Sequence, residues 1–79
     1  MSLEEDLKKE TLKWLEKIEN IDFEGDSRFV ENIRAYISDS KYFLEINDLV
    51  RAFECVVWAW AWLEIGKEYG FVRWLDESV

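Results

Sequence analysis

Residues 55–63 read CVVWAWAWL, a run without one polar side chain in a chain that is otherwise strongly acidic. Tryptophan alternates with alanine there, and a period of two taken alone is typical of a strand. The flanking sequence favours a helix, because residues 49–69 contain no turn signal and a lone strand would lack partners. We therefore predict one helix over residues 49–69, with Asp48 as its N-cap and Gly70 as its stop.

Two further helices are predicted upstream of this one. Ser2 and Glu5 have the spacing of a capping box, which starts a first helix over residues 3–20. A loop with Phe23 pinned to the core leads to a second helix over residues 27–45. Only three residues link the second helix to the third, so these two must form an antiparallel hairpin. The chain is predicted to be all-α, one domain over residues 1–79, an up-and-down three-helix bundle whose short C-terminal tail folds back.

Composition limits the function. The 79 residues include 10 basic and 18 acidic side chains, a net charge of −8 that repels nucleic acid and anionic membranes. The single cysteine and the absence of histidine leave no internal disulfide and no usual zinc pattern. The start of the chain does not resemble a signal peptide, and nine apolar residues are too few to span a bilayer. We expect a cytoplasmic protein without cofactor or metal.

The third predicted helix has three distinct stripes. One seam, assigned to contacts with the other two helices, consists of Leu49, Phe53, Val56, Trp60 and Leu63. Beside it lie the small residues Ala52, Ala59 and Gly66, against which the second helix is expected to pack closely. Trp58 and Ile65 point away from the seam, and Trp62 lies at the boundary. An exposed Trp and Ile on so small a domain indicate that something covers them.

Three covers are compatible with the sequence. The tail offers Phe71, Trp74 and Leu75 at i, i+3 and i+4; a second protein molecule, either another copy or a different partner, is the next; a small apolar ligand is the third. We interpret the chain as a non-enzymatic protein-association domain. Its anchors on the rear of the third helix are Trp58, Trp62, Ile65 and Trp74.

An alternative is a small-molecule or cation site between the second and third helices. Asp39 borders the apolar arc of its helix and is expected to be half-buried, paired with Arg51 or a hydroxyl across the hairpin. The sharper interpretation gathers an aromatic pocket for a cationic group from Tyr36, Asp39, Tyr42 and Trp62. A third possibility is an accessory chain of a larger assembly, which the sequence permits without favouring.

Catalytic residues are scarce. The chain has no histidine and no glycine-rich phosphate loop. Cys55 lies within the apolar run, where burial raises the pKa of a thiol and makes it inert. Asp39, Asp48 and Glu64 could supply oxygen ligands, but no loop presents them at regular spacing. We expect neither catalysis nor metal binding.

The segment from Tyr36 to Phe71 contains the runs YISDSKYFL, DLVRAF and AWAWLEIG, followed by a later Gly-Phe. In these runs it resembles an archaeal family of small helical proteins, domain of unknown function 357. Ala61 stands where the family pattern has glycine, and Glu64 and Ile65 replace Asp-Ala. The resemblance implies an up-and-down three-helix bundle and implies no activity.

Overall fold

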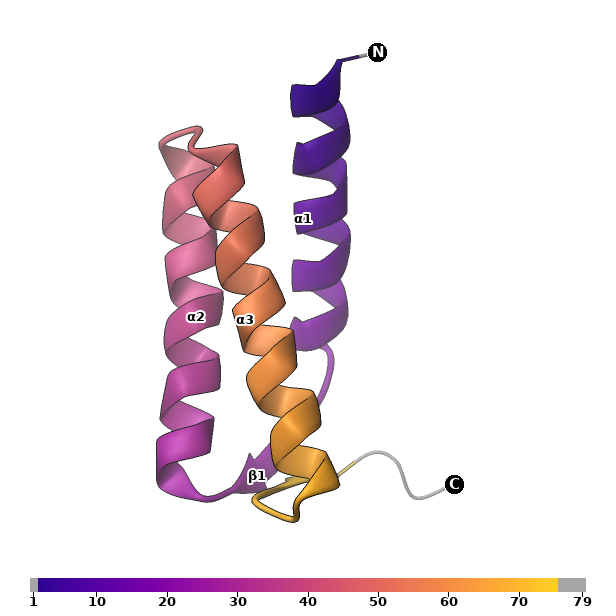
Figure 1. Cartoon of the computed structure of the whole chain (residues 1–79), viewed down its shortest axis with the longest axis vertical. Coiled ribbons are helices and arrows are strands. Elements are labelled where there is room, and N and C mark those ends of the chain that lie inside the picture. The colour runs from indigo at the N-terminus through magenta and orange to yellow at the C-terminus, as the bar shows by residue number, and fades with distance from the viewer. Residues whose placement is uncertain (1, 76–79) are drawn as a thin grey trace.

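The computed structural model describes residues 2–75. Three helices run up and down, α1 (Leu3–Glu19), α2 (Ser27–Glu45) and α3 (Leu49–Glu68), and two short strands, β1 (Phe23–Gly25) and β2 (Val72–Trp74), pair at one end (Figure 1). The predicted all-α three-helix bundle is confirmed. Each helix starts at its predicted residue and ends within one residue of its predicted end.

The helix boundaries follow from local capping chemistry. The Ser2 hydroxyl accepts a hydrogen bond from the Glu5 N–H at 3.1 Å, and the Glu5 carboxylate accepts one from the Ser2 N–H at 3.2 Å. Asp26 and Asp48 accept hydrogen bonds from the first-turn N–H groups of α2 and α3 in the same way. Gly70 ends α3 with φ +82°, a conformation that favours glycine. These contacts lie within a few residues of sequence, which is why the sequence predicts them well.

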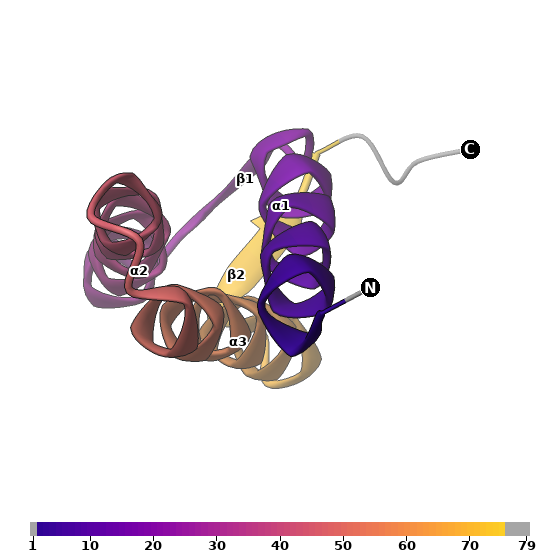
Figure 2. The ribbon, with the colours of Figure 1, turned by 90° about the horizontal axis from the view of Figure 1, so that it is seen from above.

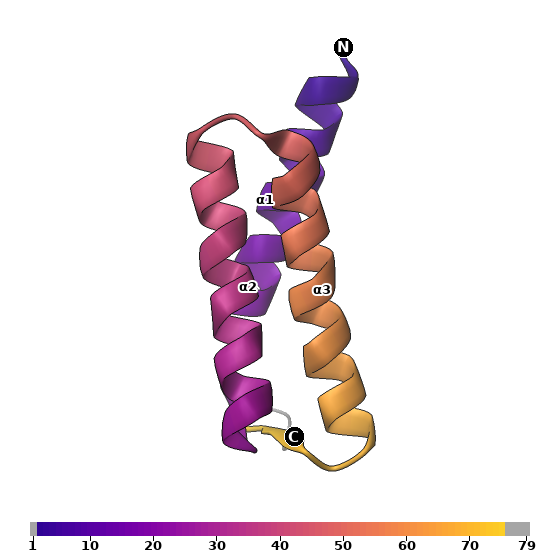
Figure 3. The same ribbon diagram turned by 60° about the vertical axis from the view of Figure 1, so that its left-hand side comes forward.

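The three helices form an open arrangement in which α3 lies between α1 and α2 and contacts both. α2 and α1 each pack along α3, whereas the backbones of α1 and α2 hardly approach each other. Figure 2 shows this from above, and Figure 3 shows α2 and α3 side by side with α1 behind them. One side of the bundle is therefore not closed by helix contacts. β1, which connects α1 to α2, crosses that side at one end.

Aliphatic side chains form the centre of the core, and the aromatic rings surround it. The fully or almost fully buried cluster consists of Ile18, Ile33, Ala59, Leu63 and Val72. Small residues on α3 let α2 come close, as predicted: the Ser40 hydroxyl donates a 2.7 Å hydrogen bond to the carbonyl of Ala52. A Cβ added to Gly66 would lie only 2.9 Å from Cδ2 of Phe29 on α2.

The predicted seam of α3 needs a correction. Leu49, Val56 and Leu63 of this seam are buried as predicted, but Phe53 and Trp60 are only half-buried, and the small residues beside the seam are buried as well. The cause is the close approach of α2 and β2 to the small residues, which turns that stripe into the core. Trp60 faces α1, where its indole meets the Trp14 ring edge-on at 5.6 Å and donates a 3.1 Å hydrogen bond to the Trp14 carbonyl.

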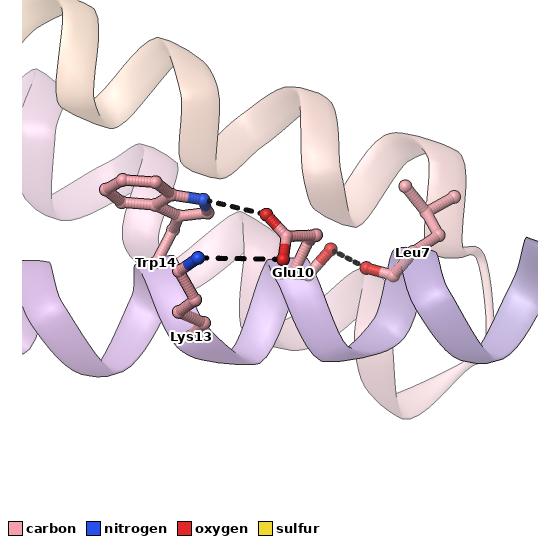
Figure 4. Close-up of polar contacts among 5 residues, drawn as sticks. Leu7, Glu10, Lys13 and Trp14 are labelled. Carbon is pink, nitrogen blue, oxygen red and sulfur yellow. Dashed lines mark hydrogen bonds and ion pairs between the residues drawn. The ribbon is translucent and has the colours of Figure 1, made fainter.

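Three side-chain polar contacts lie within α1. The Glu10 carboxylate accepts a 3.3 Å hydrogen bond from the Trp14 indole and lies 3.7 Å from the Lys13 ammonium (Figure 4). Thr11 is fully buried, and its hydroxyl donates a 2.8 Å hydrogen bond to the Leu7 carbonyl. The buried Thr11 hydroxyl therefore has a hydrogen-bond partner within its own helix.

The C-terminal tail folds back as predicted, but as a strand. Phe23 lies opposite Trp74 and Gly25 opposite Val72 in the antiparallel pair. The expected helical grouping of Phe71, Trp74 and Leu75 is wrong, because backbone hydrogen bonds to the loop between α1 and α2 hold this segment extended. Phe23 packs against the core, as predicted.

Candidate functional site

Two apolar side chains on α3 stand out from the surface. Trp58 is 51% exposed and Ile65 is 52% exposed, although both are large and lie seven residues apart on one helix. Seven residues are about two turns of helix, so the two side chains project from the same side. The outward orientation expected from the sequence is present in the structure.

A shallow hollow lies between these two side chains. It encloses about 270 Å³, and all of its lining residues are apolar: Phe29, Trp58, Ala61, Trp62 and Ile65. Ala61 lies between the two exposed side chains in sequence and leaves room at that point. Trp58 and Ile65 thus project on either side of the small Ala61.

Aromatic packing holds the floor and one edge of the hollow in place. Phe29 of α2 stacks on Phe71 with ring centroids 4.8 Å apart and meets Trp62 edge-on at 4.8 Å. Tyr36 of α2 stacks on Trp58 at 6.1 Å with an angle of 18° between the rings. Such pairs add to the stability gained from burial alone. We name Phe29, Tyr36, Trp58, Trp62 and Ile65 the aromatic face.

The tail contacts the aromatic face at Phe29, on which Phe71 stacks, but it does not cover Trp58 or Ile65. Val72 is buried against α3, and its Cγ2 would lie 2.7 Å from a Cβ placed on Gly66. Trp58 and Ile65 stay half-exposed with the tail folded through Leu75. Of the three covers considered, the described part of the tail is therefore excluded.

Trp74, the fourth predicted anchor, belongs to a different surface. It is half-buried on β2, the Lys67 ammonium lies 4.0 Å from its ring centroid, and its indole nitrogen has no hydrogen-bond partner in the described part of the chain. A second shallow hollow joins it to Ile65 across Glu64 and Glu68. Trp74 thus borders the region near Ile65 without lining the hollow of the aromatic face.

The aromatic residues of the alternative small-molecule pocket contact different rings. Tyr36 stacks on Trp58, Tyr42 packs edge-on against Phe43 at 5.4 Å, and Trp62 meets Phe29. The structure brings Tyr36 and Trp62 onto one surface through Trp58. It does not pair Tyr42 with either of them.

Asp39 is exposed, so its predicted half-burial is wrong. Its predicted partner Arg51 instead donates a 2.7 Å hydrogen bond to the carboxylate of Asp48. The reason is local geometry, because the N-cap carboxylate lies one turn before Arg51 on the same helix. This contact lowers the pKa of Asp48 through the hydrogen bond from Arg51, and it raises the pKa of Arg51.

Cys55 is buried between α2 and α3, as predicted. Burial is the main cause that raises the pKa of its thiol, and the negative charges of Asp39 and Glu54 add to the effect. The thiol therefore stays protonated near neutral pH, and a protonated thiol is a poor nucleophile. The geometry favours a structural role for this side chain.

Slow modification of Cys55 follows from this environment. In the folded protein at pH 8, we expect the thiol to react with Ellman's reagent at least about 100-fold more slowly than a small free thiol, because it is both protonated and inaccessible. In denaturant the two rates should be similar. A fast reaction of the folded protein would show that Cys55 is an accessible nucleophile and would contradict the buried, inert assignment.

Residues 2–75 contain no group of three carboxylate or thiol side chains that could hold a metal ion. None of the described helices is both long and apolar enough to cross a membrane.

Comparison with known proteins places the chain in a family. The family model described as protein of unknown function (DUF357) matches residues 3–72. The chain belongs to the DUF357 family. The resemblance seen over the segment from Tyr36 to Phe71 is thereby confirmed, and the match extends it through the first helix.

A solved member of DUF357 has the same fold. The crystal structure of protein AF1782 from Archaeoglobus fulgidus is 66% identical in sequence and superposes with a TM-score of 0.89, covering 94% of this chain and 100% of that one. No curated protein matches the sequence. Membership in DUF357 supports the bundle and supplies no activity.

Phe29 is a half-buried residue of the aromatic face that the sequence analysis does not identify. Its position between Phe71 and Trp62 depends on the path of the tail after Gly70. The seven-residue spacing of Phe29 and Tyr36, which matches that of Trp58 and Ile65, is the signal that could have joined the two helices into one surface.

Proposed function

We propose that this chain is a non-enzymatic protein-association domain that pairs with a second copy of itself through the aromatic face. The observation that carries the proposal is the pair of half-exposed anchors, Trp58 and Ile65, on either side of a hollow with only apolar lining. Tryptophan in a well-packed apolar surround is the commonest type of side chain to dominate the binding energy of an interface.

The surface is complementary to itself. A two-fold axis brings the same patch of both copies together, so that residue i meets residue j and j meets i. If two α3 helices cross antiparallel near Ala61, each Trp58 lies opposite Ile65 of the other copy. The small Ala61 at the crossing point lets the two helices approach closely. The Trp58 and Ile65 side chains of each copy can then enter the hollow of the other copy.

Charge acts against this pairing and makes it dependent on salt. Each copy carries a net charge of −8, and Glu54, Glu64 and Glu68 are exposed on α3 near the apolar surface. Two such copies repel each other at low ionic strength, and added salt screens that repulsion over about 10 Å at 0.1 M. Self-association through the aromatic face should therefore strengthen as salt is raised.

The double substitution of Trp58→Ala with Ile65→Ala tests the proposal. We expect the dissociation constant of the dimer to rise by at least about 100-fold, because two central anchors are lost from each copy. Far-UV circular dichroism should show the same helical content as the wild type, since both side chains are half-exposed. Sedimentation equilibrium over a wide concentration range measures the association.

Val50→Ala is the matched control for this experiment. Val50 also lies on α3 and is 71% exposed, but it lies outside the hollow. We expect this variant to dimerise like the wild type. Equal dimerisation of the double variant, or a collapse of its helicity, would contradict the proposal, because the two side chains would then be dispensable or part of the core.

A further inference from the structure

A second surface, independent of the aromatic face, lies between α1 and α2. Two adjoining hollows of about 480 and 570 Å³ share Glu19 and Lys41 and together form one groove along both helices. We name it the α1–α2 groove. Its apolar walls come from both helices and from β1: Leu12, Leu15, Ile18, Phe23, Ile37 and Leu44.

The groove exists because the bundle is incomplete on this side. In a four-helix bundle each helix packs on two neighbours and stays apart from the helix diagonal to it. Here α3 packs on both α1 and α2, which hardly approach each other, as Figure 2 shows. α1 and α2 thus stand where diagonal helices would, and the position diagonal to α3 is the groove.

Charged side chains also line the groove and determine which kind of partner it suits. Six charged side chains line it, and the acidic ones are Glu16, Glu19, Asp22 and Glu45. Glu19 pairs with Lys41, and the Arg34 guanidinium lies 5.3 Å from the ring of Phe23. Over residues 2–75, the other three carboxylates form no ion pair. Glu16, Glu19 and Asp22 lie on the α1 side, whereas the α2 side carries Glu45 together with the basic Arg34 and Lys41. With four acidic and two basic side chains the groove has a net charge of −2, and its α1 edge is the negative one.

We infer that the α1–α2 groove binds an amphipathic helix of a different protein, with an apolar stripe flanked by Lys or Arg. A second copy of this chain is disfavoured there, because its net charge is −8 and the groove itself is net acidic, with its negative charge on the α1 edge. From Arg34 to Glu45, the α2 side spans about 16 Å at 1.5 Å per residue. That length accommodates about three turns of helix, with apolar anchors at i, i+3, i+4 and i+7.

The probe for this site is a designed peptide of about 16 residues, long enough to form helix on binding. It carries leucine at the stripe positions, lysine at the flanking positions and blocked ends; a second peptide has glutamate in place of lysine. Both are titrated into 15N-labelled full-length protein. We expect the lysine peptide to shift the amide signals of groove residues such as Leu15, Ile37 and Leu44, and to bind more weakly as salt is raised.

Leu12→Lys and Val57→Lys form a matched pair of variants. Each residue is 48% exposed in the folded protein, and each substitution adds one positive charge, but only Leu12 lines the groove. Leu12→Lys should weaken binding of the lysine peptide at least about tenfold, whereas Val57→Lys should change it less than about twofold. Thermal unfolding of both variants verifies that each is folded.

A second pair of variants isolates the charge contribution. The double variant Glu16→Lys, Glu45→Lys reverses the charge of two side chains that line the groove. The double variant Glu54→Lys, Glu68→Lys makes the same change in net charge on α3, away from the groove. Only the first pair should abolish the preference for the lysine peptide over the glutamate peptide. Equal weakening by both pairs would show that net charge alone drives binding and would overturn the assignment of the groove.

Other results would also overturn the inference. One is the absence of binding up to about 1 mM peptide, which corresponds to a binding free energy weaker than about 4 kcal/mol. The others are equal binding of the two peptides and amide shifts confined to the aromatic face. The titration is repeated on the Trp58→Ala, Ile65→Ala double variant, in which the groove is intact. Peptide binding there separates failure of the groove from failure of self-association.

Discussion

Leu63→Ala is expected to lower the free energy of unfolding by about 4 kcal/mol, near the upper end for a leucine truncation in a core. The side chain is fully buried in the cluster that joins Ile18 of α1, Ile33 of α2 and Val72 of β2. Its removal deletes contacts to every main element at once. The surrounding elements cannot all collapse into the cavity, so most of the loss remains.

Urea unfolding followed by circular dichroism measures this effect, and Leu12→Ala is the control. Leu12 is a leucine on α1 with about half of its surface exposed, so its truncation should cost less than about 1 kcal/mol. A similar cost for the two substitutions would show that Leu63 is not at the centre of the core. The assignment of the buried side of α3 would then be wrong.

Gly25→Ala is expected to destabilise the protein by about 3 kcal/mol through backbone strain and overpacking together. Gly25 has φ +148°, and a Cβ there would lie 2.2 Å from the Phe71 carbonyl oxygen and 2.9 Å from Cα of Val72. Both are backbone atoms, of the residue before β2 and of the first residue of β2, so no side-chain rotation relieves the clash. The strands must separate for the methyl group to fit.

Gly70→Ala separates the two causes. Gly70 also has a positive φ, +82°, but a Cβ there would meet nothing within 4 Å. Only the backbone strain remains, which costs about 1 kcal/mol for a non-glycine residue. Chemical denaturation gives both values. The contact is refuted if Gly25→Ala costs no more than Gly70→Ala.

Amide hydrogen exchange locates the damage in Gly25→Ala. The Asp26 N–H donates a 2.8 Å hydrogen bond to the Phe71 carbonyl, and the Leu75 N–H donates one of 2.8 Å to the Asp22 carbonyl. Both amides should lose protection in this variant, while the middle of α2 keeps its protection. Loss of protection throughout the chain would mean that the strand pair is required for the whole fold.

The sequence predicts the helices and their ends well because the signals are local. Ser2, Asp48 and Gly70 each act within one turn of their own position, so the neighbouring residues suffice to identify a start or a stop. The order of helices and the short link between α2 and α3 then leave few topologies. The outward direction of Trp58 and Ile65 also follows from the helical period alone.

The remaining features depend on contacts between distant segments. Pairing of Phe23 with Trp74 joins the loop after α1 to the tail after α3, and neither strand carries a pattern long enough to indicate it. The exact side of α3 that becomes core depends on how closely α2 and the tail approach Gly66. The sequence predicts a partner for Asp39 across the hairpin, whereas Arg51 pairs with the N-cap Asp48 one turn before it.

The two proposed surfaces should respond to salt in opposite ways. Self-association through the aromatic face brings like charges together, so screening strengthens it. Binding of a basic helix in the α1–α2 groove brings opposite charges together, so screening weakens it. The opposite trends allow both surfaces to be studied in one preparation, since raising salt favours one interaction and disfavours the other.

The most direct test of the central claim is the mass of the wild-type protein in solution, measured by light scattering on a sizing column. The measurement covers a wide concentration range at low and high salt, with reductant present to exclude a disulfide through Cys55. We expect a monomer of 9.6 kDa on dilution that converts to a species of twice that mass at high concentration, more readily at high salt. A mass of 9.6 kDa at every concentration and at both salt levels would contradict self-association through the aromatic face.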